Sequence, residues 1–260
     1  MMRRAFGMLT AALLAFATLL PRGAAADDLD RVEAAGELRI AMSGQYPPFN
    51  FVDDRNEVVG FDVDIGKAIA ERMGVAPAIV TTAWDGIIAG LLAGKYDAIV
   101  GSMTITDERR KAVDFVGPYY RAARAVFLPE GSPARSLADL EGKRIGATLG
   151  ETHERWARDR GGWTLRTYKG LPELLLELRA GRLDAIVVDD IPVRIAMKET
   201  GDRFVALDDP AIGGAGDEIG IAIRKDNPGL KAAMQQALDE IMADGTYEAI
   251  AMRWIGSDIR

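Results

Sequence analysis

The sequence predicts an α/β protein of two lobes, each built on a mostly parallel sheet flanked by helices. Segments with strand character alternate with amphipathic helical segments, which is typical of parallel sheets. One helix–turn–strand unit occurs twice, because GKYDAIV at Gly94 to Val100 matches GRLDAIV at Gly181 to Val187 position for position. With 260 residues and 48% hydrophobic content, the chain is also long enough to bury two cores.

The first 26 residues predict a signal peptide. Arg3 and Arg4 give a charged start, an apolar run extends from Ala5 to Leu20, and Ala24-Ala25-Ala26 is a cleavage sequence of small residues. The alternative is a membrane anchor, but the run is shorter than the roughly 18 residues that a spanning helix needs. No cysteine is present to carry a lipid at the junction. We therefore expect a soluble, exported protein that begins near Asp27 and is not lipid-anchored.

The first lobe is predicted to begin with alternating strands and helices. Strands are expected at Leu38 to Met42 and at Pro77 to Thr82, with an amphipathic helix from Phe61 to Met73 between them. The first repeat follows, as a helix from Trp84, a glycine C-cap and a buried strand at Ala98 to Val100.

A mixed strand from Ala122 to Leu128 is predicted to cross into a second lobe. That lobe is expected to hold the following elements in order: a short helix at Leu137 to Leu140, a strand at Lys143 to Ala147, a helix opening at Thr152, a strand at Thr164 to Tyr168, the second repeat, a helix at Val193 to Thr200 and a strand near Phe204 to Leu207. A strand at Ile219 to Ile223 is expected to return, and helices at Leu230 to Met242 and Tyr247 to Trp254 complete the first lobe. The predicted lobes are residues 27–121 with 216–260, and residues 122–215.

Polar side chains follow the strands of both repeats. The first strand leads to Ser102 and Thr104, and Thr106 is an N-cap for a helix that carries Arg109. The second strand leads to Asp189 and Asp190, and we expect Asp189 to face the ligand, with the reverse assignment as the alternative. Ligands of open α/β sheets bind beyond the carboxyl ends of the strands, so a ligand cleft is expected between the lobes. Such a cleft suits a zwitterion, because the hydroxyls and guanidinium on one side can bind its carboxylate and the carboxylates on the other side can bind its cation.

Composition argues against several classes of function. The chain has no cysteine, which excludes disulfides, thiolate catalysis and cysteine–zinc sites. One histidine and scattered carboxylates predict no metal site, and no cofactor is expected. The 39 acidic and 32 basic residues are dispersed without a basic block, so nucleic acid is not an expected partner.

A succession of short motifs along the chain resembles the polar amino-acid-binding family of bacterial solute-binding proteins, family 3. The motifs are Tyr46-Pro-Pro-Phe49, Gly60-Phe-Asp-Val-Asp64, Trp84-Asp85, Gly94 to Asp97, Thr104 to Arg109, Val113-Asp-Phe115, Pro118-Tyr-Tyr120, Ala243 to Tyr247 and Arg253-Trp254. The resemblance implies the two-lobed periplasmic-binding-protein fold of type II. It also implies a periplasmic, monomeric protein that captures a free L-amino acid and delivers it to the membrane permease of an ABC importer, by a hinge motion that closes the cleft.

The resemblance also implies roles for single residues. Arg109 is expected to grip the α-carboxylate with Thr104 and Thr152, whereas Ser102 and Asp189 bind the α-ammonium. Tyr46 and Trp84 are expected to sandwich the side chain, with packing in the core or at the rim as the alternative. Ser43 stands where relatives that bind cationic side chains carry an acid, and Glu151 stands where a small hydroxyl is more usual. We expect solvent and the helix dipole to satisfy Glu151, and the ligand to be a polar uncharged or modestly apolar amino acid. The alternative is that Glu151 supplies a substitute acid for a cationic ligand.

Two other functions share this scaffold. A cyclohexadienyl dehydratase is one, but Pro192 occupies the position where those enzymes carry a glutamate, and no catalytic residue is predicted. The only histidine, His153, is expected at the rim of the cleft. A periplasmic sensor module is the other alternative, and its ligand site would look the same.

Overall fold

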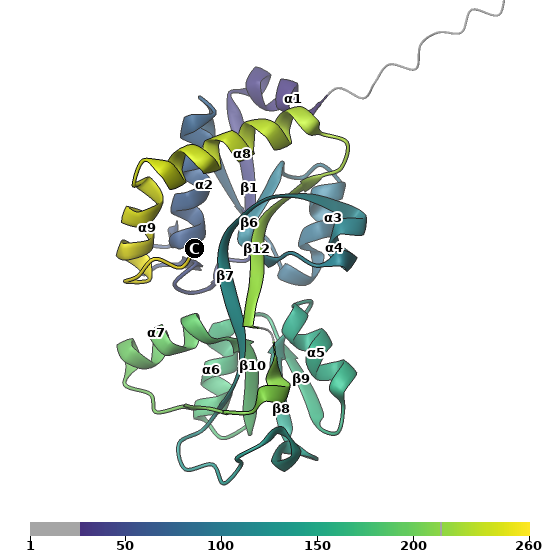
Figure 1. Ribbon diagram of the computed structural model, residues 1–260, viewed down its shortest axis with the longest axis vertical. Coiled ribbons are helices and arrows are strands. Elements are labelled where there is room, and N and C mark those ends of the chain that lie inside the picture. The colour runs from purple at the N-terminus through teal and green to yellow at the C-terminus, as the bar shows by residue number, and fades with distance from the viewer. Residues whose placement is uncertain (1–26, 214) are drawn as a thin grey trace, which may run out of the picture.

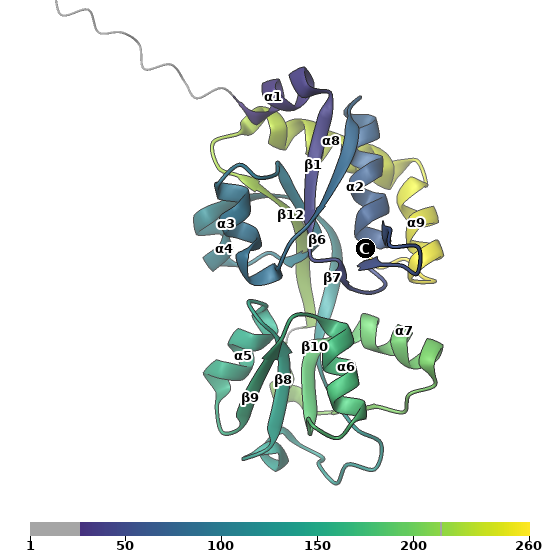
Figure 2. The same ribbon diagram turned by 180° about the vertical axis from the view of Figure 1, so that it is seen from behind.

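The computed structural model describes residues 27–213 and 215–260, and it has two lobes joined by a pair of long strands (Figures 1 and 2). The predicted signal peptide lies outside the described residues. One sheet of nine strands runs through both lobes in the order β5-β1-β6-β12-β7-β10-β8-β9, and β11 also pairs with β7. Within the described residues, no helix is long and apolar enough to cross a membrane.

The first lobe holds three parallel strands and its sheet is covered on both faces. Its strands are β1 (Glu37–Met42), β5 (Ala76–Thr81) and β6 (Ala98–Thr104), with a small separate sheet of β2 (Gln45–Tyr46), β3 (Asn50–Val52) and β4 (Val58–Val59). Its helices are α1 (Asp28–Ala35), α2 (Phe61–Arg72), η1 (Trp84–Gly86), α3 (Ile87–Leu92), α4 (Asp107–Ala112), α8 (Pro228–Ala243) and α9 (Thr246–Trp254). Helix α1 was not expected from the sequence.

Side chains of the central strands alternate between two apolar clusters. Ile40 and Met42 of β1 pack in one cluster with α2, whereas Ala41 between them packs in the other with Trp84 and Ile87. Because successive side chains of a strand point to opposite faces, a strand covered on both sides must be apolar throughout. This is why the strands read as continuous hydrophobic runs.

The second lobe repeats this plan with parallel strands β8, β9 and β10. Its elements are η2 (Leu137–Leu140), β8 (Arg144–Thr148), α5 (Thr152–Arg160), β9 (Thr164–Tyr168), α6 (Leu171–Arg179), β10 (Ala185–Asp189), α7 (Asp190–Thr200), β11 (Val205–Ala206) and η3 (Pro210–Ile212). The α/β class, the two lobes and the parallel order within each lobe are confirmed.

The lobes are connected by β7 (Val113–Leu128) and β12 (Ala215–Arg224), which are antiparallel to one another. The sequence indicated a crossing strand from Ala122, but β7 starts nine residues earlier, at Val113, and serves the sheets of both lobes. Its outer half pairs with β10, where Asp189 lies opposite Arg124. Two hydrogen-bonded strands therefore join the lobes.

The repeated sequence unit forms the same structure twice. Gly94 and Gly181 have positive φ values of 70° and 67° at the ends of their helices. The next residues, Lys95 and Arg182, donate backbone hydrogen bonds to the carbonyls of Gly90 and Glu177, which closes the last helical turn.

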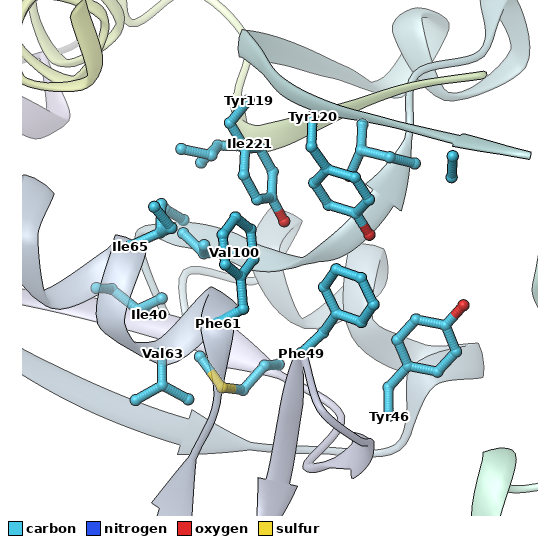
Figure 3. Close-up of a cluster of buried hydrophobic side chains, with 14 of the residues drawn as sticks. Ile40, Tyr46, Phe49, Phe61, Val63, Ile65, Val100, Tyr119, Tyr120 and Ile221 are labelled. Carbon is cyan, nitrogen blue, oxygen red and sulfur yellow. The ribbon is translucent and has the colours of Figure 1, made fainter. Parts of the chain in front are cut away.

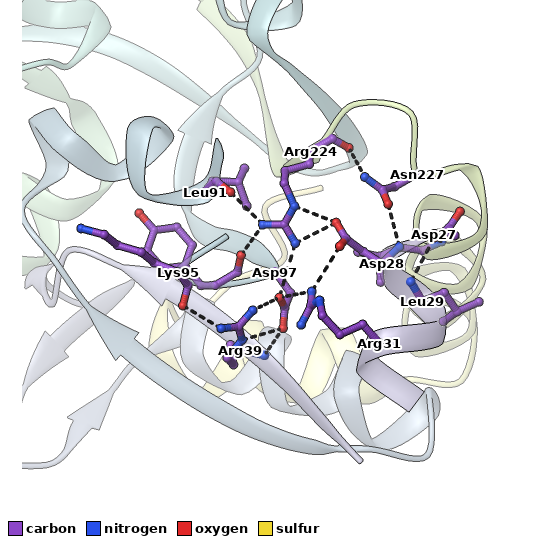
Figure 4. A network of polar contacts seen from close by, with 12 residues as sticks. Asp27, Asp28, Leu29, Arg31, Arg39, Leu91, Lys95, Asp97, Arg224 and Asn227 are labelled. Carbon is purple, nitrogen blue, oxygen red and sulfur yellow. Dashed lines mark hydrogen bonds and ion pairs between the residues drawn. The ribbon is translucent and has the colours of Figure 1, made fainter. Parts of the chain in front are cut away.

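The aspartate of each repeat anchors the start of a strand. Asp97 accepts hydrogen bonds from the backbone N–H and the guanidinium of Arg39 on β1. Asp184 accepts the same set from Arg144 on β8. In the first lobe, Arg31 also donates to Asp97 and so attaches α1 to this network (Figure 4). Both aspartates lie at the amino ends of the parallel strands, away from the carboxyl ends where a ligand is expected. They are therefore structural and do not belong to the ligand site.

Aromatic side chains fill the core between α2 and β7. Phe49 stacks on Tyr120 with 5.0 Å between ring centres, and Phe61 meets Tyr120 edge to face at 5.8 Å (Figure 3). Tyr46 stacks on Phe49 at 5.6 Å and lies at the end of this row (Figure 3). The row fixes the ring of Tyr46, whose hydroxyl continues into the cleft described below.

Candidate functional site

A small cavity lies between the lobes at the carboxyl ends of the parallel strands. All nine residues singled out from the sequence line it: Ser43, Tyr46, Trp84, Ser102, Thr104, Arg109, Glu151, Thr152 and Asp189. Gly101 and His153 complete the lining. The cavity volume is only about 10 Å³, about the room that one water molecule needs. The cleft is therefore closed.

Contacts between the lobes hold the cleft closed. The Tyr46 hydroxyl of the first lobe donates to Asp189 Oδ2 of the second at 2.6 Å. Arg109 Nη2 donates to the Gly150 carbonyl at 3.4 Å. At Gly170 the approach is so close that a Cβ atom would lie 2.6 Å from Cβ of Gln45, so no larger residue fits there without displacing the other lobe.

Arg109 presents a cation without a carboxylate partner. The Thr106 hydroxyl accepts from the Arg109 backbone N–H at 3.1 Å, which caps α4 and sets the direction of the side chain. The guanidinium donates to the Thr104 carbonyl at 2.9 Å and lies 5.7 Å from the centre of the Trp84 ring. Within residues 27–213 and 215–260, no carboxylate forms an ion pair with Arg109. Partial burial lowers the pKa of Arg109, because the charged form loses part of its hydration.

Of the two neighbours Asp189 and Asp190, Asp189 faces the cavity. It ends β10 and is buried, whereas Asp190 begins α7 and pairs with Arg194 at 3.2 Å, outside the cavity. Burial acts to raise the pKa of Asp189, but the charge of His153 and the hydrogen bonds from His153 and Tyr46 outweigh it and lower the pKa. Asp189 therefore stays ionised and still has lone pairs free to accept from a ligand.

His153 is inside the cavity, and the expected rim position is wrong. Only 3% of the residue is exposed. Its Nε2 lies 3.1 Å from Asp189 Oδ1, and its Nδ1 lies 3.1 Å from Glu151 Oε2. The ionised Asp189 carboxylate only accepts hydrogen bonds, so His153 Nε2 donates to it, and in the imidazolium form Nδ1 donates to Glu151 as well. Burial by itself lowers the pKa of His153, but Asp189 and Glu151 raise it to about 10.

The expectation for Glu151 is also corrected. Glu151 occupies the N-cap position of α5 without capping the helix by its side chain. Its carboxylate is instead turned to His153, with 16% of the side chain exposed. The imidazolium is the partner of Glu151, in place of solvent and the helix dipole.

Asp62 is a buried carboxylate beneath the cavity that the sequence analysis did not select. It accepts hydrogen bonds from the hydroxyls of Tyr119 and Ser102, at 2.6 and 2.8 Å, and from the amide of Asn50 at 2.7 Å. Because the Ser102 hydroxyl proton is directed to Asp62, the lone pairs of Ser102 Oγ are left to accept. Asp62 thereby prepares Ser102 to receive a donor such as an ammonium group. Ser102 itself has a positive φ of 59°, a conformation that few non-glycine residues adopt.

Asp62 should make stability depend on pH. Burial raises its pKa to about 6, while an unfolded aspartate titrates near pH 3.9. Between about pH 4 and 6 the folded state therefore binds more protons, and its stability falls as the pH rises. We expect the free energy of unfolding of wild type, measured in urea relative to that of Asp62→Asn, to fall as the pH rises across this window. A difference that is constant from pH 4 to 7 would contradict the assignment.

A larger groove opens beside the cavity. It has a volume of about 510 Å³ and shares Ser43 and Trp84 with the cavity. The rest of its lining is Gln45, Thr81, Thr82, Ala83, Asp85, Leu149 and Lys169. The groove thus offers hydroxyl groups, the carboxylate of Asp85 and the ammonium group of Lys169. Trp84 lies between these groups and the cavity. No group of three or more side chains suited to a metal ion occurs among the described residues.

Comparison with known proteins gives the family. The model of bacterial extracellular solute-binding proteins, family 3, matches residues 38–257. The L-cystine-binding protein TcyJ of Escherichia coli is 34% identical over 89% of this chain and 87% of its own. ABC transporter arginine-binding protein 1 of Escherichia coli is 36% identical over 85% of this chain and 91% of its own.

A solved structure agrees with these matches. An ancestral amino acid-binding protein, described as a precursor of cyclohexadienyl dehydratase, superimposes with a TM-score of 0.81 at 33% identity, over 88% of this chain and 99% of its own. The nine-stranded sheet, the two lobes and the match over nearly all described residues agree. The chain belongs to the bacterial extracellular solute-binding proteins of family 3.

Proposed function

We propose that this protein is the periplasmic substrate-binding component of an ABC importer and that it captures a free L-amino acid in the cleft between its lobes. The observation that carries the proposal is the pair of Arg109 and Asp189 on opposite lobes. One is a cation without an ion-pair partner among the described residues, and the other is an ionised, buried carboxylate. Relatives named for binding L-cystine and arginine support the ligand class.

The polar groups of the cavity match the backbone of an amino acid. We propose that Arg109 binds the α-carboxylate through its planar fork, with the hydroxyls of Thr104 and Thr152 beside it. Asp189 and the lone pairs of Ser102 then accept from the α-ammonium. We propose Tyr46 and Trp84 as the walls of the side-chain site.

We propose a ligand without net charge. The two relatives reported above are named for L-cystine and for arginine, which differ in charge, since cystine is neutral overall at pH 7. Glu151 is paired with His153, and Asp189 is both paired with His153 and assigned to the α-ammonium, so neither acid is free for a cationic side chain. A buried charge without a partner is costly. The outer groove, with Asp85 and Lys169, suits the far end of a long polar or zwitterionic side chain such as that of cystine.

The two lobes and their connection support capture by closure. We propose residues 27–121 with 216–260 as lobe 1 and residues 122–215 as lobe 2, with bending of β7 and β12 between them. A ligand that contacts both lobes stabilises the closed form only when it is bound. A monomer is sufficient for this, because one chain supplies the whole lining.

We propose that the protein is not an enzyme. His153 is the obvious candidate for acid–base work, but it is held as an imidazolium by two carboxylates, with a pKa of about 10. A group that keeps its proton across neutral pH is a poor general base. The ancestral neighbour that preceded a dehydratase was itself an amino acid-binding protein. Delivery to a permease, and not reporting to a receptor, is the function we assign from the transporter relatives.

A thermal-shift screen of the common amino acids and L-cystine tests the proposal. Any ligand that binds only the native state raises the unfolding midpoint, by about 2.7 kcal/mol of stability at a hundredfold excess over Kd. We expect neutral polar amino acids or cystine to give the largest shifts and arginine, lysine and glutamate to give small ones. If no amino acid shifts the midpoint, the proposed function is wrong; if lysine or arginine gives the largest shift, the choice of ligand is wrong.

A further inference from the structure

The charged groups that line the cavity cancel one another. Arg109 and His153 are cations, and Glu151 and Asp189 are anions. Three of the four come from α5 and the end of β10 on the second lobe, and they form a continuous row in which His153 lies between the two acids. Arg109 faces them from the first lobe. The net charge of the lining is therefore zero.

His153 owes its charge to its position between these acids. The ring is buried, and each ring nitrogen lies 3.1 Å from a different carboxylate. A neutral imidazole has only one N–H group, so it would leave one of these contacts with two acceptors and no proton. The imidazolium supplies an N–H group to each of the two contacts.

We propose that His153 is the residue that selects for ligands without net charge, by neutralising Glu151 and Asp189 inside the closed cleft. The inference rests on the proposed function, an amino acid bound between Arg109 and Asp189. With His153 in place, a zwitterion leaves the cavity neutral, whereas a cationic side chain adds a charge with no free carboxylate to meet it. Without His153, Glu151 becomes a free acid at the side of the cavity that a cationic side chain can reach.

Other charges near the site do not alter this comparison. Asp62 lies behind Ser102 outside the lining, and Arg124 forms an ion pair with Asp217 at 3.8 Å behind Asp189. These groups are the same in every variant considered below. The differences between variants then depend on Glu151 and His153 alone.

Three variants change the charge of the lining in a defined way. His153→Gln leaves a net charge of −1, Glu151→Gln leaves +1, and the double variant returns to zero. Glutamine keeps hydrogen-bonding capacity at both positions, which limits the loss of structure. Arg155→Gln is the matched control, because Arg155 is an exposed cation two residues further along α5 and pairs outward with Asp159.

Two pairs of ligands of matched shape report the charge preference. L-Arginine and L-citrulline differ by one positive charge, and L-glutamate and L-glutamine differ by one negative charge. Affinities are measured by calorimetric displacement of the tightest neutral ligand of wild type. A unit charge acting over 5 to 10 Å in a protein site changes affinity by on the order of tenfold to a hundredfold.

We expect opposite responses from the two single variants. His153→Gln should raise the affinity for arginine relative to citrulline by on the order of tenfold to a hundredfold, and Glu151→Gln should raise that for glutamate relative to glutamine by a similar factor. The double variant and Arg155→Gln should keep the wild-type preference for both neutral ligands. If the role of His153 were purely structural, His153→Gln would lower the affinities for all four ligands by a similar factor.

The outcomes separate this inference from the proposed function. If wild type binds neutral amino acids but the ligand ratios do not move in His153→Gln and Glu151→Gln, the role of His153 is wrong while the proposed function stands. If His153→Gln does not fold by circular dichroism, Glu151→Gln still decides, because it must by itself raise the affinity for glutamate relative to glutamine. If wild type binds no amino acid, the proposed function itself fails.

Discussion

Arg109→Ala is expected to lower the affinity for the amino acid ligand by about two orders of magnitude or more. Removing one partner of a buried, hydrogen-bonded charge pair costs roughly 2–5 kcal/mol, and each 1.4 kcal/mol is about tenfold in Kd. The loss should be large here because Arg109 is the only cation of the lining on its lobe, and its remaining bonds go to the carbonyls of Thr104 and Gly150. No other side chain of the lining can replace it.

Two further variants make this result specific. Arg109→Lys keeps the charge but loses the planar fork, so its affinity should lie between those of wild type and Arg109→Ala. Arg110→Ala is the matched control, because Arg110 is exposed, packs over the Phe115 ring and does not line the cavity. Calorimetry that gives Arg109→Ala a near wild-type Kd would refute the carboxylate site.

The imidazole of His153 is expected to remain protonated through neutral pH in the folded protein. The pKa of about 10 lies well above the usual value of 6.5, because the two carboxylates outweigh the effect of burial. The chain contains one histidine, so the imidazole signals of an untagged protein need no assignment. Nitrogen-15 NMR should show two protonated ring nitrogens from pH 5.5 to 8.5, without a titration step. A midpoint near 6.5 would contradict the assignment.

This protonation also fixes the sign of a stability effect. A group whose pKa is raised by folding stabilises the protein fully below its unfolded pKa, and that contribution is lost as the pH rises through the folded pKa. His153 should therefore add stability at pH 6 that declines steadily between about pH 6.5 and 10. The decline should be absent from His153→Gln, and thermal unfolding across this range measures it.

Much of the fold could be predicted because local chemistry and tertiary structure agree. Gly94 and Gly181 predicted helix ends that need a positive φ. The same Ala-Ile-Val triplet follows each glycine closely and predicted a buried strand in both repeats. Helix α1 gave a weaker signal, since Val32 is its only fully buried residue. It is held instead by polar contacts to Asp97 and Arg224, which are remote in sequence (Figure 4).

The sequence predicted which residues line the candidate site, but it did not predict how the charged residues among them pair. Residues at the carboxyl ends of strands could be placed at one cleft because the sheet order brings those ends together. The pairing of His153 with Glu151 and Asp189 depends on the direction in which the first turn of α5 points. A single histidine in a polar helix, THERWARDR, carries no periodicity that reveals this direction. Asp62 was similarly hidden, because an acid in the first turn of a helix is ordinarily exposed.

The order of the strands has a consequence for how the chain acquires its structure as it emerges from a ribosome or a membrane channel. Strand β12, from near the end of the chain, lies between β6 and β7 in the sheet of the first lobe. The strands and helices of the second lobe, from β8 to α7, are by contrast continuous in sequence. Domains tend to fold in the order in which they are made. Here the lobe that begins first must be completed last, because β6 and the first half of β7 gain their shared partner strand only when residues 215–224 arrive.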